Sequence, residues 1–214
     1  HTDEIAQSEA AFDKKLSRFW LHNSFITIDD QKISKSLGNI YSFDDLAEKG
    51  FSHLDYRMWV LQGHYQSVRN FSFDDLLAAK NRLLRYRNFA ALRHQTTSLK
   101  LMTVRDIEDH IAKVTSEASN NINTPIALSA LDEIISSKFH PDERILSFYD
   151  QLFGLKLLET TPDISNNNKT LIKNRELKKS SKNYTAADEI RKTLEQDGIN
   201  LLDSSDATIW QYSK

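Results

Sequence analysis

Apolar side chains recur three or four positions apart along most of the chain, a spacing typical of helices with one buried face. In the first predicted helix, Ile5, Phe12, Leu16 and Phe19 form this pattern. Elsewhere, a serine followed three residues later by an aspartate marks a helix start. The predicted helices cover residues 1–19, 42–49, 53–62, 73–94, 103–118, 124–138, 141–158, 169–182 and 185–196. The pattern therefore predicts a mainly α-helical protein.

Strand-like sequence is confined to short segments. Phe25–Ile28 reads as one strand, and Ile199–Leu202 reads as another that precedes a tail containing Trp210. Residues 161–168 are polar and show no periodicity, so they are the predicted linker. Five glycines and three prolines are few for 214 residues, which again favours helices.

Composition excludes several classes of protein. The chain has no cysteine, so it can form no disulfide and cannot complete a thiolate metal site by itself. No apolar stretch approaches the roughly 20 residues of a membrane span, and no signal peptide is visible. We therefore expect a cytoplasmic protein without membrane association. The net charge of −2 gives no global indication of nucleic-acid binding.

Positive charge is nevertheless concentrated in two segments. Leu76–Arg105 contains seven lysines and arginines and no acidic residue. Lys169–Lys182 carries six positive charges against Glu176, a local net charge of +5, and Tyr184 follows closely. Cations beside an exposed aromatic ring are typical of surfaces that bind single-stranded nucleic acid. For the first segment, a solvated helix face is an equally good interpretation.

The most specific pattern is the octet Lys32-Ile33-Ser34-Lys35-Ser36-Leu37-Gly38-Asn39. Two lysines three positions apart, separated by small hydroxyl residues and followed by a glycine, predict a mobile loop that can close over a polyphosphate. Ammonium groups directed at a phosphorus under in-line attack stabilise the charge that builds up on its oxygens. The alternative is a solvated loop between a hairpin and a helix.

This octet resembles the Lys-Met-Ser-Lys-Ser loop of class I aminoacyl-tRNA synthetases, with Ile33 in place of the methionine. Other segments resemble cysteinyl-tRNA synthetases in particular. They are His1–Glu9, Trp20–Ser24, Leu54–Arg57, Gly63–Tyr65, Asn70–Ser72, Ile122–Pro125, Tyr184–Asp188 and Gly198–Ile199. The resemblance covers nearly the whole chain and is weakest in 95–120 and 136–170.

The resemblance implies three domains. Residues 1–72 would end an α/β catalytic domain and include its stem-contact segment, 73–162 would form a helical tRNA-binding bundle, and 163–214 would form a small α/β-type anticodon-binding domain. The Rossmann half that binds the nucleotide would lie upstream. We therefore expect the C-terminal portion of a longer enzyme, which would not form an adenylate by itself.

The implied activity is ATP-dependent conversion of cysteine to cysteinyl-adenylate, followed by transfer of cysteine to tRNA(Cys). Lys35 is the first expected catalytic residue and Lys32 supports it, while Ser34 and Ser36 join them in binding ATP. Mg²⁺ is expected on the ATP phosphates. A monomer is the expectation from the family.

The resemblance also implies a zinc ion, held in the family by two cysteines, a histidine and a glutamate, that takes the substrate thiolate. Glu4 matches the glutamate. The family's histidine lies four residues before the glutamate, whereas His1 lies three before Glu4, so His1 is not expected to be a ligand. The zinc site is thus expected to be incomplete in this chain. Alternatively, Glu4 has no metal role and is an acidic residue that the dipole favours near the N-terminus of its helix.

For tRNA, the resemblance places Tyr184 where the family stacks an anticodon base and Asp188 where a carboxylate reads the anticodon guanine. Asp203 aligns with a second acid that reads a base. Lys179 stands where the family has an arginine, and a lysine cannot make the bidentate contact of a guanidinium. An alternative for Asp188 is a capping role, because it lies three residues after Thr185.

Two other functions stay open. The first is the cysteine ligase of mycothiol synthesis, a relative with the same loop chemistry and no tRNA; residues 165–214 speak against it because that enzyme lacks an anticodon unit. The second is a stand-alone tRNA-binding helical module in which the loop is vestigial. A reading frame that continues upstream into a Rossmann domain would exclude the second.

Overall fold

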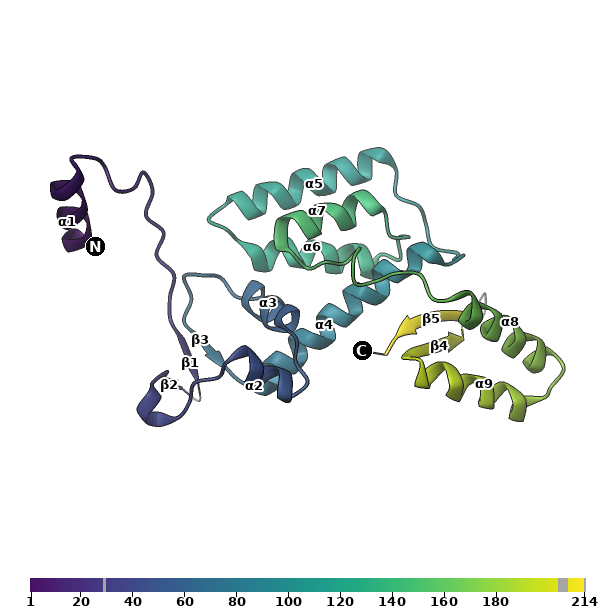
Figure 1. Cartoon of the computed structure of the whole chain (residues 1–214). Coiled ribbons are helices and arrows are strands. Elements are labelled where there is room, and N and C mark those ends of the chain that lie inside the picture. The colour runs from purple at the N-terminus through teal and green to yellow at the C-terminus, as the bar shows by residue number, and fades with distance from the viewer. Residues whose placement is uncertain (29, 204–207, 214) are drawn as a thin grey trace.

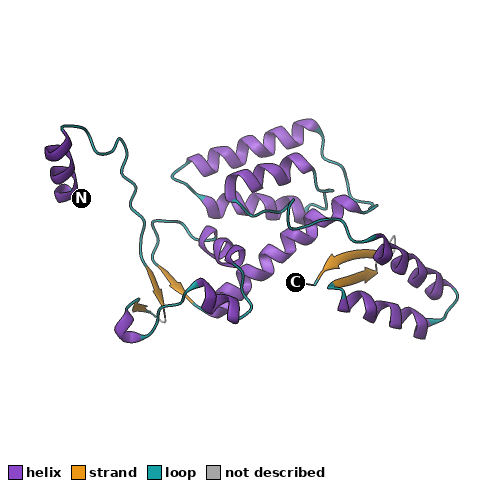
Figure 2. Ribbon diagram, viewed as in Figure 1, coloured by secondary structure: helices purple, strands orange, loops and turns teal. Residues whose placement is uncertain are grey.

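The structure is a computed structural model that describes residues 1–28, 30–203 and 208–213, without the side chain of Lys35. It is mainly helical, as predicted, and Figure 2 shows helices along most of the chain, two small sheets, and a long loop between the first helix and the first strand. The α-helices are α1 Thr2–Phe12, α2 Phe43–Glu48, α3 His53–Leu61, α4 Phe73–Ala91, α5 Val104–Ser119, α6 Thr124–Ser136, α7 Glu143–Phe153, α8 Asn166–Ser180 and α9 Tyr184–Gln196. The 3₁₀ turns are η1 Lys35–Leu37 and η2 Leu92–His94. No helix among the described residues is both long and apolar enough to cross a membrane.

The first helix is shorter than its sequence pattern predicts. It ends at Phe12, and Asp13 takes a left-handed backbone conformation with φ of 47°. The prediction of helix over 13–19 was therefore wrong. The reason is that α1 buries none of its residues and lies apart from the rest of the chain (Figure 1), so no packing stabilises a longer helix. Phe19 consequently remains 88% exposed.

A three-stranded sheet carries the lysine-serine loop. Its strands are β1 Ile26–Ile28, β2 Gln31–Lys32 and β3 Arg69–Phe71, in the order β2-β1-β3. β1 pairs antiparallel with β2 and parallel with β3. The sequence predicted β1, which is apolar at Ile26 and Ile28, but neither of its partners, because β2 and β3 are short and mainly polar and so carry no strand pattern.

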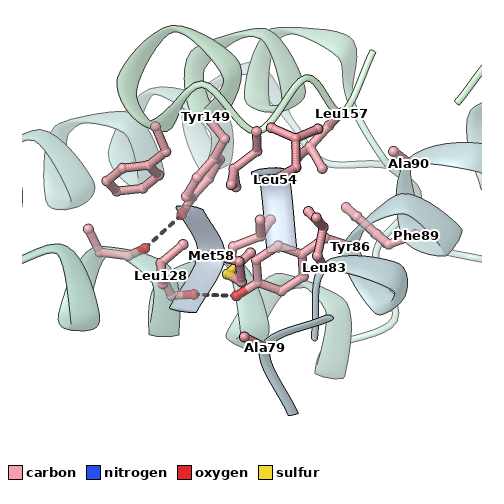
Figure 3. Packing of buried hydrophobic residues seen from close by; sticks show 14 of the residues in the cluster. Leu54, Met58, Ala79, Leu83, Tyr86, Phe89, Ala90, Leu128, Tyr149 and Leu157 are labelled. Atoms are coloured by element: carbon pink, nitrogen blue, oxygen red, sulfur yellow. Dashed lines mark hydrogen bonds between the residues drawn. The ribbon is translucent and has the colours of Figure 1, made fainter. Parts of the chain in front are cut away.

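The main core lies where α3 crosses α4 and where α6 and α7 cover that crossing. Met58, Tyr86 and Tyr149 are completely buried there (Figure 3). Each buried tyrosine hydroxyl donates to a backbone carbonyl of α6: Tyr86 to Leu128 at 3.2 Å and Tyr149 to Ala127 at 3.1 Å. Both hydroxyls are thus satisfied without water, and they fix the position of α6.

A smaller C-terminal unit contains α8, α9 and a two-stranded antiparallel sheet of β4 Ile199–Asp203 and β5 Thr208–Tyr212. Trp210 therefore lies in a strand, where the sequence analysis expected a tail without assigned structure. The predicted linker also ends earlier than expected, because Ser165 caps α8 and the helix begins at Asn166. The core of this unit consists of Ala91, Ile164, Leu194, Ile199, Leu201 and Trp210.

Helix starts agree best with the sequence. Ser42 and Asp45 form the predicted capping box at the start of α2: Ser42 Oγ accepts from the backbone N–H of Asp45 at 3.2 Å, and Asp45 Oδ2 accepts from the backbone N–H of Ser42 at 2.7 Å. The capping alternative for Asp188 is wrong: α9 begins at Tyr184, and its cap is Asn183, whose Oδ1 accepts from the backbone N–H of Ala186 at 3.2 Å. Asp188 is thus available for another role.

Candidate functional site

The lysine-serine loop is closed by Asn39. Its Oδ1 accepts from the backbone N–H of Ser34 at 2.9 Å, and its Nδ2 donates to the carbonyl of Lys32 at 3.2 Å. Gly38, with φ of 65° and open space where a Cβ would lie, supplies the left-handed backbone that lets the chain turn back. Asn39 thus fixes the ends of the loop, a role that sequence reasoning did not assign although the residue ends the octet.

Inside the loop, the serine hydroxyls face one another. Ser34 Oγ lies 3.1 Å from Ser36 Oγ and accepts from the backbone N–H of Leu37 at 3.3 Å. Lys32 is exposed on β2, opposite Thr27 of β1. The side chain of Lys35, the first expected catalytic residue, lies outside the described residues. Hydroxyl groups and the Lys32 ammonium therefore gather on one short loop with the chemistry to bind an anion.

A cleft of about 630 Å³ lies beside this loop. Lys32 and Ile33 line one side, and Phe25, Ile26 and Val68 contribute apolar surface. A lysine in the lining of a mainly apolar cleft suits a ligand that carries an anion next to a less polar part. The described residues thus provide a place for such a ligand directly against the octet.

The residues around Glu4 do not form a zinc site. His1 Nδ1 lies 3.5 Å from Glu4 Oε1, and the His1 ring stacks on Trp20 and His22 with centroid distances of 5.3 and 4.9 Å. Within the described ranges, no group of three or more histidine, cysteine, aspartate or glutamate side chains could hold a metal ion. The chain also has no cysteine thiolate to offer. Its donor set therefore does not fit the four-ligand zinc that the resemblance implies, and we derive no chemistry through that ion.

The acid-free segment Leu76–Arg105 is not a free cationic face, because its positive side chains have partners within the protein. Arg82 and Arg85 both bind Asp132 of α6. Arg93 donates to carbonyls in the segment between α7 and α8, and Lys80 donates to the Gly50 carbonyl at 2.7 Å. The other cations lie as follows: Arg87 near the buried Asp55, Lys100 over the ring of Phe139, and Arg105 against Asp109. These arginines and lysines mainly join helices to one another.

Helix α8 and the turn after it carry positive charge that is exposed to solvent. Lys173, Lys178 and Lys182 are exposed, and none of them forms an ion pair with another described residue. Tyr184 follows at the start of α9 and is 60% exposed. The sequence-based expectation of cations beside an accessible aromatic ring therefore has a matching surface on the α8–α9 hairpin.

Asp203 lies at the centre of a charged cluster below this surface. The guanidinium of Arg175 donates to both of its carboxylate oxygens, at 2.9 and 2.7 Å, and Lys179 Nζ lies 3.0 Å from Oδ2. Thr208 Oγ1 adds a third donor at 2.9 Å. These hydrogen bonds, with Arg175 first, hold the pKa of Asp203 far below its ordinary range, and the same pairing raises the pKa of Arg175. The cluster joins α8 to β4 by a charge-assisted contact.

Asp188 differs from Asp203 in its surroundings. It is exposed on α9, and no hydrogen bond or ion pair to another described residue occupies its carboxylate. Its charge acts on the nearby Arg175, whose pKa it helps to raise. Of the two acids predicted to read bases, Asp188 is therefore the one with free acceptor oxygens.

Comparison with known proteins gives the class of the chain. Residues 1–81, which include the lysine-serine loop, match the family model for the catalytic domain of class I (C) tRNA synthetases. This part of the chain is therefore similar to the class I tRNA synthetases.

Within that class, its relatives are cysteine–tRNA ligases. The ligase of Treponema denticola is 34% identical over 99% of this chain and 49% of its own length, and that of Finegoldia magna is 32% identical over 100% of this chain and 49% of its own. The ligase of Opitutus terrae is 34% identical over 96% of this chain and 44% of its own length. The chain thus spans about half the length of the curated relatives it matches, which is consistent with the C-terminal portion that the sequence predicts.

Proposed function

We propose that this chain is part of a cysteine–tRNA ligase that activates cysteine with ATP and transfers it to tRNA(Cys). The observation that carries the proposal is the similarity to cysteine–tRNA ligases over nearly all of the chain. In the first step, a carboxylate oxygen of cysteine attacks the α-phosphorus of ATP, and pyrophosphate leaves. In the second, a hydroxyl of the terminal ribose of tRNA attacks the acyl carbon, and AMP leaves.

The lysine-serine loop would act in the first step. Lys35 is our first choice for stabilising the charge on the phosphate oxygens in the transition state, with Lys32 in support. The paired hydroxyls of Ser34 and Ser36 would donate to phosphate oxygens, while Asn39 holds the loop closed. Mg²⁺ bound to ATP would neutralise part of the phosphate charge.

The α8–α9 hairpin would bind the anticodon. Tyr184 offers an exposed ring for stacking, and Asp188 offers a free carboxylate for the edge of a base. Asp203 and Lys179 already bind one another, so we propose that they contribute to tRNA binding through the solvent-exposed part of the cluster that they form with Arg175. In this proposal Asp188 reads a base, whereas Asp203 and Lys179 shape the surface around it.

Glu4 remains a proposed zinc ligand from the resemblance alone. It would supply one oxygen, and the remaining donors would come from residues outside this chain. Metal analysis of a complete protein with Glu4→Ala tests this role. Unchanged zinc content together with unchanged affinity for cysteine would remove Glu4 from the site.

The main test replaces both loop lysines by alanine in the complete polypeptide and measures cysteine-dependent exchange between ATP and pyrophosphate. Lys32→Ala with Lys35→Ala should slow exchange by about a hundredfold or more, as for the loss of charged groups that stabilise a transition state. Lys14→Ala, an exposed lysine outside the loop, is the matched control. Exchange at the unaltered rate in the double variant would refute the proposed function.

A further inference from the structure

Strand β5 has one edge that β4 does not cover. β4 and β5 pair in the register Leu201 with Trp210 and Ile199 with Tyr212. Because backbone groups alternate direction along a strand, the N–H and carbonyl groups of Trp210 and Tyr212 point away from β4. Unpaired backbone groups on an edge strand need another partner or water.

Two side-chain amides supply that partner. Asn88 Oδ1 accepts from the N–H of Tyr212 at 2.9 Å, and its Nδ2 donates to the carbonyl of the same residue at 3.4 Å. Gln95 Oε1 accepts from the N–H of Trp210 at 2.9 Å, and its Nε2 donates to the Trp210 carbonyl at 3.0 Å. Each amide thus reproduces the pair of hydrogen bonds that a neighbouring strand would make. We call Asn88 and Gln95 the amide clamp.

The amide clamp flanks an apolar contact. Ala91 lies between the two amides in sequence, is completely buried, and belongs to the core of the C-terminal unit together with Trp210. The hydroxyl of Tyr212 also donates to the carbonyl of Pro162, at the entry to this unit. The end of α4 is therefore built into the C-terminal unit.

The opposite end of α4 is fixed beside the lysine-serine loop. Phe73, its first residue, contacts Phe71 of β3 and Tyr41 just after the octet, with ring centroids 5.4 and 5.1 Å apart. β3 pairs with β1, from which the loop hairpin extends. A helix of 19 residues is roughly 28 Å long at 1.5 Å per residue. Figure 1 shows α4 running from the three-stranded sheet to the C-terminal unit.

We propose that Asn88 and Gln95 are positioning residues that hold the C-terminal unit at one fixed distance and orientation from the lysine-serine loop, so that a single tRNA engages both. This role rests on the proposed function. The amides bind the backbone of β5, so they would act on tRNA through β5 and through α9, which carries Tyr184 and Asp188. A preset orientation lowers the cost of binding a long, stiff ligand at two separate places.

The expected size of the effect follows from the docked fraction of the C-terminal unit. If loss of the amide clamp lowers that fraction from nearly one to about a tenth, the apparent dissociation constant for tRNA rises about tenfold. Activation of cysteine, which requires no tRNA in the proposed mechanism, stays unchanged.

The first experiment measures orientation and uses the absence of cysteine from the chain. Ser116→Cys on α5 and Lys192→Cys on α9, both exposed, receive spin labels for distance measurement by pulsed electron paramagnetic resonance. The unaltered clamp should give one narrow distance distribution, and Asn88→Ala with Gln95→Ala should broaden it. Asn81→Ala is the matched control, since Asn81 lies seven residues before Asn88 on the same helix, is exposed and bonds to no other described side chain.

Native helix content in the double variant is verified by circular dichroism. If the double variant loses it, Asn88→Asp and Gln95→Glu are used instead, because they keep the side-chain shape but replace the donor to each carbonyl by a negatively charged oxygen that repels it. A distance distribution that stays narrow without the clamp would overturn the inference.

The second experiment measures binding of a tRNA(Cys) transcript to the same labelled chains. A tenfold weaker affinity in the clamp variant, with the Asn81→Ala control unchanged, supports the positioning role. Unchanged affinity together with a broadened distribution overturns it and leaves the proposed function intact. Failure of the unaltered chain to bind the transcript would instead refute the proposed function, and the positioning role with it.

Discussion

The guanidinium of Arg175 donates to both carboxylate oxygens of Asp203, and the Arg175 side chain is only 3% exposed. A buried arginine that loses its partner leaves an uncompensated charge, whereas an exposed acid can be replaced with little effect on stability. Replacing Asp203 should therefore affect stability more than replacing Asp188, although both acids are predicted to read bases.

We expect Asp203→Ala to lower the free energy of unfolding of the chain by about 2 kcal/mol, less than for a fully buried pair because Asp203 itself is 31% exposed. Urea unfolding followed by circular dichroism measures the change. Asp188→Ala is the control and should change stability by less than about 0.5 kcal/mol. Equal effects of the two substitutions would contradict a structural role for the Arg175–Asp203 pair.

Tyr184 and Asp188 should have separable effects on tRNA. Tyr184→Ala should weaken binding of tRNA(Cys) about tenfold through lost stacking, whereas Tyr184→Phe keeps the ring and should bind normally. Asp188→Ala should reduce discrimination between cognate and altered anticodons. Lys179→Ala should weaken binding of transcripts with cognate and with altered anticodons equally. Filter binding with transcripts of each kind tests these outcomes, and a uniform loss from Asp188→Ala would exclude its reading of a base.

Asn39→Ala should slow cysteine activation by about tenfold in the complete polypeptide, because two hydrogen bonds that close the loop are lost. The catalytic lysines remain, so the effect should be smaller than that of removing them. Exchange between ATP and pyrophosphate measures it. Asn120→Ala, an exposed asparagine at the end of α5, should leave the rate unchanged. Loss as large as that of the double lysine variant would show that Asn39 does more than close the loop.

Stability should fall as the solution is acidified through the range in which His110 titrates. Burial lowers the pKa of His110 from 6.5 to about 4, and Lys113 adds to this effect while Glu133 opposes it. The unfolded chain takes up a proton near 6.5 and the folded chain only near 4, so protonation favours unfolding between these values.

The expected loss is about 1–2 kcal/mol on going from about pH 7 to about pH 4.5, reduced because the ring is only partly buried. His110→Gln, which can still donate to Tyr149, should remove this part of the pH dependence. His53→Gln, on the exposed start of α3, should leave the pH dependence of stability unchanged. Unfolding by urea at several pH values provides the measurement, and an identical pH profile for His110→Gln would exclude His110 as the cause.

The sequence by itself determined the features that depend on neighbours in the chain. The helices from α2 to α6 and α9 lie close to their predicted ranges, because capping residues such as Ser42 and an amphipathic period act within a few residues. The prediction of helix over 154–158 was wrong, because α7 ends at Phe153, where Gly154 takes the left-handed conformation that terminates it. The octet was also recognisable, since its chemistry needs lysine, serine and glycine in one short stretch.

Only the tertiary structure decided what the cations and amides do. The partner of Arg82 is Asp132, fifty residues away, and the partner of Asn88 is Tyr212, at a separation of 124. Helical spacing at Leu16 and Phe19 did not extend the helix, because α1 buries none of its residues. Trp210 became a strand residue because β5 pairs with β4 and because Gln95 binds the N–H and the carbonyl of Trp210 on the other edge. Local preferences are worth a few tenths of a kcal/mol per residue, so contacts between distant residues decide wherever the two compete.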